Sequence, residues 1–213
     1  MQRTVNSNKN DKNIKMILIG ESGTGKSSLI NTYNGNDFMS ETVSSLSSNF
    51  IKKEVKINDN TYNLKLWDTA GQERFRSLNK IYIKDSQIVV FVYDITQKKT
   101  FDELSFWVNY VNEIIPKAAI FGLVGNKSDL VEEIINGNNN EDILVNTDDG
   151  ENYADEIGAL FYETSAKDDR AGFANYINLL IAKFISEKKN SEKELEILAL
   201  NNNPKKKKKK NCC

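Results

Sequence analysis

The order of apolar and polar positions along the chain predicts alternating strands and helices. Three short apolar runs, at 14–19 (interrupted only by Lys15), 88–93 and 120–124, are typical of strands buried on both faces of a sheet. Between the last two runs, apolar residues recur at spacings of three and four from Phe101 to Ile115, which predicts an amphipathic helix ended by Pro116. Strands that alternate with helices favour a mainly parallel α/β sheet.

Strict alternation marks a further pair of strands. Apolar and polar residues alternate over 50–57 and again from Tyr62 to Trp67, and the polar stretch 58–60 between them predicts the turn of an antiparallel hairpin. Three more helices are predicted: one at about 26–34, one that begins with an N-cap at Thr147, and one from Phe173 to Phe184. A short strand is predicted at 160–163. Residues 35–49 are polar and without periodicity, and such a long loop is usually functional.

Length and composition indicate one domain with two tails. The 213 residues are enough for a substantial core. We expect an Asn-rich disordered arm at 1–12, a domain at 13–187 with a surface insertion at about 131–146, and a flexible tail at 188–213. No apolar run is long enough to cross a bilayer, and the N-terminus lacks the apolar core of a secretory signal.

Cysteine and charge patterns distinguish the tail from the domain. The two cysteines are Cys212 and Cys213, so we expect no disulfide in the core and a reducing, cytosolic setting. The chain has no histidine, which excludes an imidazole base or ligand. Because the whole chain carries −1 and the six lysines Lys205–Lys210 carry +6, the remainder carries −7. An anionic membrane suits this basic run better than nucleic acid, although a solvated tail or nuclear-import patch is the simpler alternative.

A phosphate-binding motif follows the first predicted strand. Residues 20–27 spell G-x-x-x-x-G-K-S and lead into a predicted helix. In that context, backbone N–H groups cradle phosphate, Lys26 adds a positive charge at the β- and γ-phosphates, and the Ser27 hydroxyl is a ligand for Mg²⁺. A Gly-rich turn with an incidental lysine is the alternative.

Three more polar motifs follow predicted strands. In the stretch Asp68-Thr69-Ala70-Gly71-Gln72, the aspartate can hold Mg²⁺ and the Gly71 N–H can donate to a terminal phosphate. Gln72 can orient an attacking water. In the stretch Asn126-Lys127-Ser128-Asp129, the Asp129 carboxylate can accept bonds from the N1–H and amine of guanine. In Ser165-Ala166-Lys167, the Ala166 N–H can meet the guanine O6. Taken alone, each of these motifs has an ordinary turn as its alternative, but the position of the first one after a phosphate loop and a hairpin favours a functional role.

Together and in this order, the four motifs resemble those of the Ras-superfamily small GTPases over about residues 13–185. Within the superfamily, residues 67–78, 92–96 and 163–167 and the Cys-Cys pair are similar to the Rab branch, and residues 82–86 and 123–127 to its Golgi-associated Rab-six-like subgroup. The resemblance implies a phosphate-loop small G domain with a mainly parallel six-stranded sheet flanked by about five helices.

What the resemblance implies for function is a GTP/GDP switch that uses Mg²⁺, with two nucleotide-dependent loops at about 38–50 and 69–82. The implied catalytic residues are Gln72, Lys26 and Gly71, and the implied metal ligands are Ser27, Ser45 and Asp68. The implied nucleotide contacts are Glu21, Ser22, Gly23, Thr24, Gly25, Lys26, Ser27, Ser28, Phe38 (against the guanine), Ser45, Gly71, Asn126 (bracing the loops), Lys127, Asp129, Ser165, Ala166 and Lys167.

The first switch departs from the family pattern. Ser45-Leu46-Ser47 stand where the family has Thr-Ile-Gly, so we expect a looser GTP-bound switch and altered effector choice. Because neither the phosphate loop nor the first switch contains an arginine, we expect slow intrinsic hydrolysis and an activating protein that supplies the charge.

The resemblance also implies partners and a location. Geranylgeranyl chains on Cys212 and Cys213, with Lys205–Lys210, would give the two signals that stable membrane anchoring requires. We expect a monomer that meets an exchange factor, an activating protein, a dissociation inhibitor and effectors, and no nucleic acid. The expected location is the cytoplasmic face of Golgi or endosomal membranes, with Golgi favoured, in exchange with cytosol.

Two other functions stay open at this stage. A GTP-binding scaffold with little hydrolysis would fit the divergent first switch. An ATP-dependent phosphate-loop enzyme, such as a small-molecule kinase, would fit the loop alone, but Asn126 to Asp129 argue against it.

Overall fold

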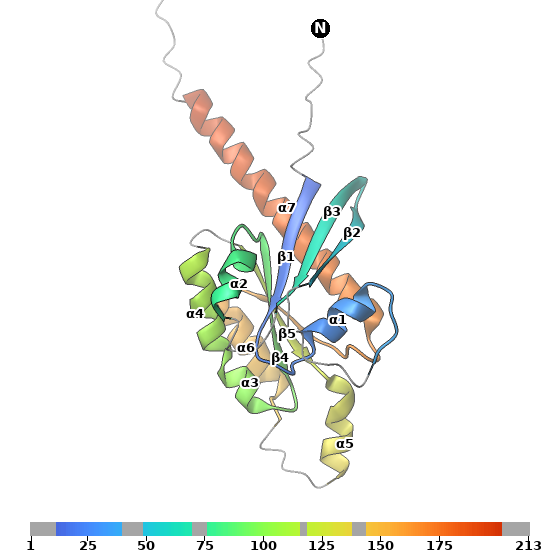
Figure 1. Ribbon diagram of the computed structural model, residues 1–213. Coiled ribbons are helices and arrows are strands. Elements are labelled where there is room, and N and C mark those ends of the chain that lie inside the picture. The colour runs from blue at the N-terminus through green and yellow to red at the C-terminus, as the bar shows by residue number, and fades with distance from the viewer. Residues whose placement is uncertain (1–11, 40–48, 70–75, 116–118, 138–143, 202–213) are drawn as a thin grey trace, which may run out of the picture.

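The computed structural model describes residues 12–39, 49–69, 76–115, 119–137 and 144–201. Their centre is a six-stranded sheet in the order β2-β3-β1-β4-β5-β6, in which β2 runs antiparallel to β3 and all other neighbours are parallel (Figure 1). The strands are β1 (Asn13–Ile19), β2 (Asn49–Ile57), β3 (Asn60–Asp68), β4 (Ile88–Asp94), β5 (Ile120–Asn126) and β6 (Leu160–Glu163). The predicted mainly parallel six-stranded sheet is confirmed.

Helices cover both faces of this sheet. They are α1 (Lys26–Tyr33), α2 (Arg76–Ile83), α3 (Lys98–Asp102), α4 (Leu104–Ile114), α5 (Val131–Asn136), α6 (Thr147–Ile157) and α7 (Arg170–Asn201), with a 3₁₀ helix at Ser128–Leu130. The described residues thus contain seven α-helices where about five were expected, and two of the seven, α3 and α5, have only five and six residues.

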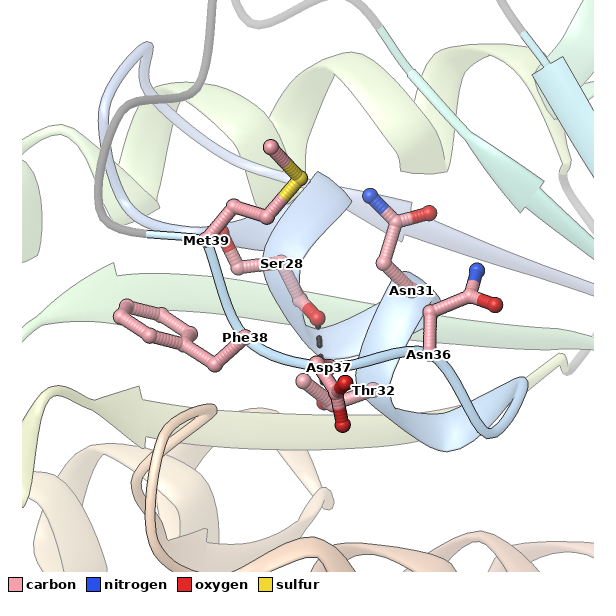
Figure 2. A pocket seen from close by; sticks show the side chains of 7 residues that line it. All are labelled: Ser28, Asn31, Thr32, Asn36, Asp37, Phe38 and Met39. Atoms are coloured by element: carbon pink, nitrogen blue, oxygen red, sulfur yellow. Dashed lines mark hydrogen bonds between the residues drawn. The ribbon is translucent and has the colours of Figure 1, made fainter.

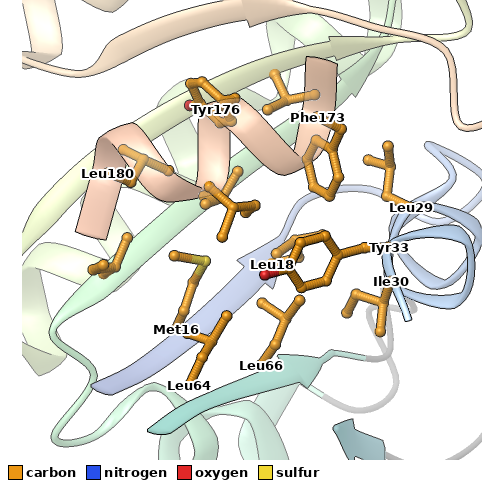
Figure 3. Packing of buried hydrophobic residues seen from close by; sticks show 14 of the residues in the cluster. Met16, Leu18, Leu29, Ile30, Tyr33, Leu64, Leu66, Phe173, Tyr176 and Leu180 are labelled. Atoms are coloured by element: carbon orange, nitrogen blue, oxygen red, sulfur yellow. The ribbon is translucent and has the colours of Figure 1, made fainter. Parts of the chain in front are cut away.

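Two apolar cores result from the alternation of side chains along the strands. Met16 and Leu18 of β1 point to the face covered by α1 and α7, where they pack with Leu29, Tyr33 and Phe173 (Figure 3). Ile17 and Ile19 point to the opposite face and join a cluster formed with α4 and α6. Every residue of β4 is buried, as its continuous apolar run predicts.

The predicted hairpin is present with a two-residue turn. Ile57 pairs with Asn60, and Asn58 between them has a φ of 53°, a left-handed conformation that asparagine tolerates better than most residues. Pairing continues along both strands and places Phe50 opposite Trp67.

Three boundaries differ from those predicted. The last helix continues to Asn201, past the expected start of the tail at 188, because this segment is rich in the strong helix formers glutamate, lysine and leucine. Within the expected insertion 131–146, residues 131–136 form α5, and the buried Val145 donates its N–H to the Ile95 carbonyl at 2.9 Å. The N-cap of α6 is Asn146, which has an extended backbone, and Thr147 is the first helical residue, with its hydroxyl donating to Glu163 Oε2 at 3.0 Å.

Candidate nucleotide-binding site

The loops that follow β1, β3, β5 and β6 meet at the carboxyl edge of the sheet, where open parallel sheets bind ligands. The first of them, residues 20–25, needs glycine for steric reasons. Gly25 has a φ of 89°, and a Cβ there would overlap the Asn126 amide nitrogen. Gly20 has a φ of 150°, and a Cβ there would overlap the Val92 carbonyl oxygen. The loop therefore lies directly against the ends of β4 and β5.

Lys26 extends into the centre of this loop. Its buried ammonium donates to the Gly20 carbonyl at 2.9 Å and to the Glu21 carbonyl at 2.6 Å. Burial lowers the pKa of Lys26 to about 8, while the carboxylates of Asp68 and Glu21 act in the opposite direction. A phosphate in the loop would give this cation a full negative charge to pair with.

Nucleotide binding is expected to weaken above pH 8 for this reason. Phosphate oxygens would raise the pKa of Lys26 from about 8 towards its ordinary 10.5, so that binding takes up a proton once the free lysine has lost one. The affinity for GDP should be constant below pH 7.5 and fall by about tenfold by pH 9. Calorimetric titrations in buffers of different ionisation enthalpy measure the proton uptake directly.

The matched control is Lys26→Arg, whose guanidinium stays protonated throughout this range. It should bind GDP more weakly at every pH but without the uptake of a proton at pH 9. A wild-type affinity that is the same at pH 7.5 and pH 9 would contradict the assignment of Lys26 to the phosphates.

Ser27 and Asp68 form a pair of oxygen donors beside the loop. Ser27 lies at the start of α1 and Asp68 at the end of β3. The Ser27 hydroxyl donates to Asp68 Oδ2 at 2.5 Å. Hard oxygen atoms from a hydroxyl and a carboxylate suit Mg²⁺, which keeps several waters and takes further oxygens from phosphates. Next to them, the Thr69 hydroxyl donates to the Leu18 carbonyl at 2.6 Å and fixes the chain beyond β3 against β1.

Asn126 connects the phosphate loop to the loop after β6. Its buried amide donates to the Thr24 carbonyl at 2.8 Å, and its Oδ1 accepts from the Ala166 N–H at 3.1 Å. This is the bracing arrangement that the resemblance implies. It also means that a guanine O6 would have to share the Ala166 N–H with Asn126, so the predicted contact of Ala166 with the base stays a prediction.

Asp129 is held in place from the same side. Its Oδ1 accepts from the Ser165 hydroxyl at 2.7 Å, and its Oδ2 lies 4.0 Å from Lys167 Nζ. The Ser165 oxygen in turn accepts the Lys167 N–H at 3.1 Å. The Asn-Lys-Ser-Asp and Ser-Ala-Lys motifs therefore form one connected unit with a carboxylate at its edge.

Lys127 has a structural anchor that the sequence analysis missed. It adopts a left-handed φ of 72°, and its Nζ lies 2.6 Å from Oδ2 of Asp94, a fully buried carboxylate at the end of β4. The other oxygen of Asp94 accepts from the Thr96 N–H and hydroxyl. The only signal in the sequence was the stretch Val92 to Thr96, which had served as a mark of resemblance.

Phe38 lines a small pocket beside α1. The pocket has a volume of about 260 Å³, and Figure 2 shows the Phe38 ring pointing away from Asn31 and Asn36. The chain leading to Phe38 is held by Arg170 of α7, which donates to the Asn36 carbonyl at 2.6 Å. The other lining residues are Ser28, Thr32, Asp37 and Met39.

The remaining predicted site residues divide into two groups. Thr24 is buried and its hydroxyl donates to the Glu21 carbonyl at 3.0 Å, whereas Ser22 and Gly23 are exposed at the tip of the loop. The other predicted residues lie outside the described part of the chain: Ser45, Gly71, Gln72, Lys205–Lys210, Cys212 and Cys213.

A stack of aromatic rings was not predicted as functional. The Phe50 ring stacks on Trp67 at 4.5 Å between centroids, and Trp67 packs on Tyr82 of α2 at 5.3 Å. Phe50 is 43% exposed, and Ile81, which precedes Tyr82 in α2, is 70% exposed. Alternation along the hairpin could have placed Phe50 and Trp67 on one face, but not the helix that brings Tyr82.

Comparison with known proteins agrees with this fold and site. The model of the Ras family matches residues 15–185. The Ras-related protein SEC4 of Saccharomyces cerevisiae is 36% identical over 210 residues, covering 95% of this chain and 92% of the relative. The Ras-related protein RabC of Dictyostelium discoideum is 35% identical, covering 88% and 92%, and the human Ras-related protein Rab-21 is 36% identical, covering 73% and 65%.

Fold and site together define a phosphate-loop GTPase. The chain belongs to the Ras family of small GTPases, and within it to the Rab proteins. Binding of GTP and GDP and hydrolysis of GTP follow from this membership.

Proposed function

We propose that this chain is a nucleotide-dependent switch that recruits effectors to membranes in vesicle-mediated transport. The observation that carries the proposal is the pair of hydrogen bonds made by Asn126, at 2.8 and 3.1 Å. These bonds join the loop suited to phosphates with the loops suited to guanine, so one nucleotide would contact all of them. Competition between GDP and ADP for the purified protein tests the choice of base.

The chain's own residues account for the hydrolytic step. A water oxygen attacks the γ-phosphorus, and the bond from the γ-phosphorus to the bridging oxygen breaks with its electron pair on GDP. The proton of the water passes to a phosphate oxygen, and GDP and inorganic phosphate leave. Gln72 orients the water, the Gly71 N–H donates to the γ-phosphate, and the Lys26 ammonium stabilises charge on the phosphate oxygens. Ser27, Asp68 and Ser45 would hold Mg²⁺, which when bound adds positive charge at the same oxygens.

Intrinsic hydrolysis should be slow, because the phosphate loop and first switch contain no arginine and an activating protein must supply that charge. The substitution of Ser45 for threonine favours a second candidate, a GTP-binding scaffold that scarcely hydrolyses. The two differ in whether hydrolysis depends on Gln72.

Replacing Gln72 by leucine is therefore expected to slow single-turnover hydrolysis of GTP by about tenfold, because the water loses its orienting group. The affinity for GTP should change little, since leucine removes no phosphate contact. Gln97→Leu, the same change at an exposed position before α3, is the matched control and should hydrolyse at the wild-type rate. Equal rates in wild type and Gln72→Leu would favour the scaffold.

The aromatic stack of Phe50, Trp67 and Tyr82 provides a surface for effectors. Along the sequence, Phe50 closely follows residues 40–48 and Trp67 closely precedes residues 70–75, the two segments that carry the predicted switch residues. Aromatic side chains offer large contact areas at low entropic cost. A change in either segment on hydrolysis would alter the border of this surface and so the affinity for effectors.

Anchoring through the tail completes the proposal. Geranylgeranylated Cys212 and Cys213 with Lys205–Lys210 would hold the chain on the cytoplasmic face of a Golgi or endosomal membrane, and a dissociation inhibitor would return it to the cytosol. In Figure 1, α7 projects past the end of the sheet at which β1 begins, opposite the phosphate loop. Membrane localisation that persists after both cysteines become serine would contradict lipid anchoring.

In the described ranges, no helix combines the length and apolar character needed to span a membrane.

A further inference from the structure

We propose that Trp107 of α4 positions the phosphate loop through the carboxylate of Glu21 and so slows the release of bound nucleotide. This role for Trp107 rests on the proposed nucleotide binding and adds a determinant outside the four motifs.

The contact between Trp107 and Glu21 is made by an indole N–H, which can act only as a donor. Trp107 is fully buried among the apolar residues between the sheet and α4, and its indole N–H donates to Glu21 Oε1 at 3.0 Å. An indole can only donate, and a buried donor that loses its acceptor is costly. The ring is fixed by edge contacts with Phe106 and Tyr110, at 5.3 and 6.2 Å between centroids.

The backbone of Glu21 contacts the phosphate-binding lysine directly. Its carbonyl oxygen accepts from Lys26 Nζ at 2.6 Å and from the Thr24 hydroxyl at 3.0 Å. One residue therefore bonds to the core through its side chain and to the lysine through its main chain. A shift of the Glu21 side chain would move the carbonyl that orients Lys26.

Charge gives an independent reason to assign a positioning role to Glu21. A carboxylate beside bound phosphates repels them, so its presence in this loop needs a compensating contact. The hydrogen bond from the Trp107 indole is this compensating contact, because it ties the Glu21 carboxylate to a buried side chain of the core. Carboxylate acceptors also make stronger hydrogen bonds than neutral ones.

The test measures the release of a fluorescent GDP analogue from wild type, Glu21→Ala, Trp107→Phe and the double variant. Each single variant removes the hydrogen bond, and release should be about tenfold faster, the effect of one charge-assisted bond. The double variant should release no faster than either single one, because the bond can be lost only once. Additive effects, or release at the wild-type rate, would overturn the proposal.

Glu21→Gln separates position from charge. Glutamine keeps an acceptor of the same length, so its release rate should return to within about threefold of wild type if the hydrogen bond matters. If Glu21→Gln behaves like Glu21→Ala, the charge of Glu21 matters and the positioning role is wrong. A wild-type protein that does not retain GDP would instead contradict the proposed function itself.

Two further measurements exclude a general loosening of α4. Val108→Ala removes buried volume from α4 with Trp107 intact, and it should release GDP at the wild-type rate although it melts at lower temperature.

Because the chain has two tryptophans, the fluorescence of a Trp67→Phe variant reports Trp107 alone. Its emission should shift when GDP is removed, and this shift should be absent in Glu21→Ala. Fast release in Val108→Ala, or no shift, would overturn the proposal.

Discussion

Replacing Asn126 by alanine is expected to weaken the binding of GDP and GTP by about a thousandfold. The change removes the donor to the Thr24 carbonyl and the acceptor of the Ala166 N–H, both in the interior. Each orphaned group costs about 1–3 kcal/mol, and together they correspond to roughly 4 kcal/mol of lost binding and loop order. Association and dissociation rates of fluorescent nucleotides give the affinity.

The distribution of the loss between the two rates is informative. Since the loops must be ordered to hold nucleotide, most of the effect should lie in faster dissociation. Asn112→Ala, at an exposed position of α4, is the matched control and should leave both rates and the melting temperature unchanged. An Asn126→Ala protein that retains GDP within about threefold of wild type would show that the bridge does not order the loops.

Local patterns were sufficient for most strands and helices of this chain. The apolar run at 88–93 is typical of a strand buried on both faces, and it forms β4, in which every residue is buried. The hairpin was equally explicit, because alternation fixes the buried faces and Asn58 supplies the left-handed turn. Such patterns depend on residues that are close in the sequence, so these elements can be predicted without knowledge of the fold.

Contacts between distant residues could not be predicted in this way. The Trp107–Glu21 bond joins positions 86 residues apart, and the Trp107 side chain matched an ordinary core position of an amphipathic helix. The ion pair of Lys127 with Asp94 depends on β4 and β5 being neighbours in the sheet, which no local pattern specifies. Val145 was assigned to an insertion because the polar residues around it concealed a single buried side chain.

The motifs predicted the chemistry of the site better than its internal bonds. Ser27 and Asp68 lie together as expected for two ligands of one ion. The bond from the Ala166 N–H to Asn126 was not predicted, and the contact of this N–H with the base stays a prediction. A motif specifies residue types that suit a ligand, but the hydrogen bonds among those residues follow from the packing of three separate loops.

Replacing Asp129 by asparagine is expected to change which base the protein prefers. Its carboxylate, fixed by the Ser165 hydroxyl at 2.7 Å, can accept from both the N1–H and the amine of guanine. An asparagine offers one acceptor and one donor, which matches the N1–H and the O2 of xanthine. The affinity for GTP should fall by about a thousandfold, because the bond to the guanine amine is replaced by two facing N–H donors and the bond to the N1–H loses its charge, and xanthosine triphosphate should then bind more tightly than GTP.

Competition of both nucleotides against a fluorescent analogue measures the preference. Asp155→Asn, an exposed carboxylate on α6, controls for the change in net charge and should keep the wild-type preference. A protein that loses all nucleotide binding would implicate Asp129 in the structure of the loops, where its carboxylate accepts from the Ser165 hydroxyl. Only a gain of affinity for xanthine separates base recognition from loop structure, because a disordered site cannot acquire a new specificity. If Asp129→Asn still prefers GTP, another group selects the base.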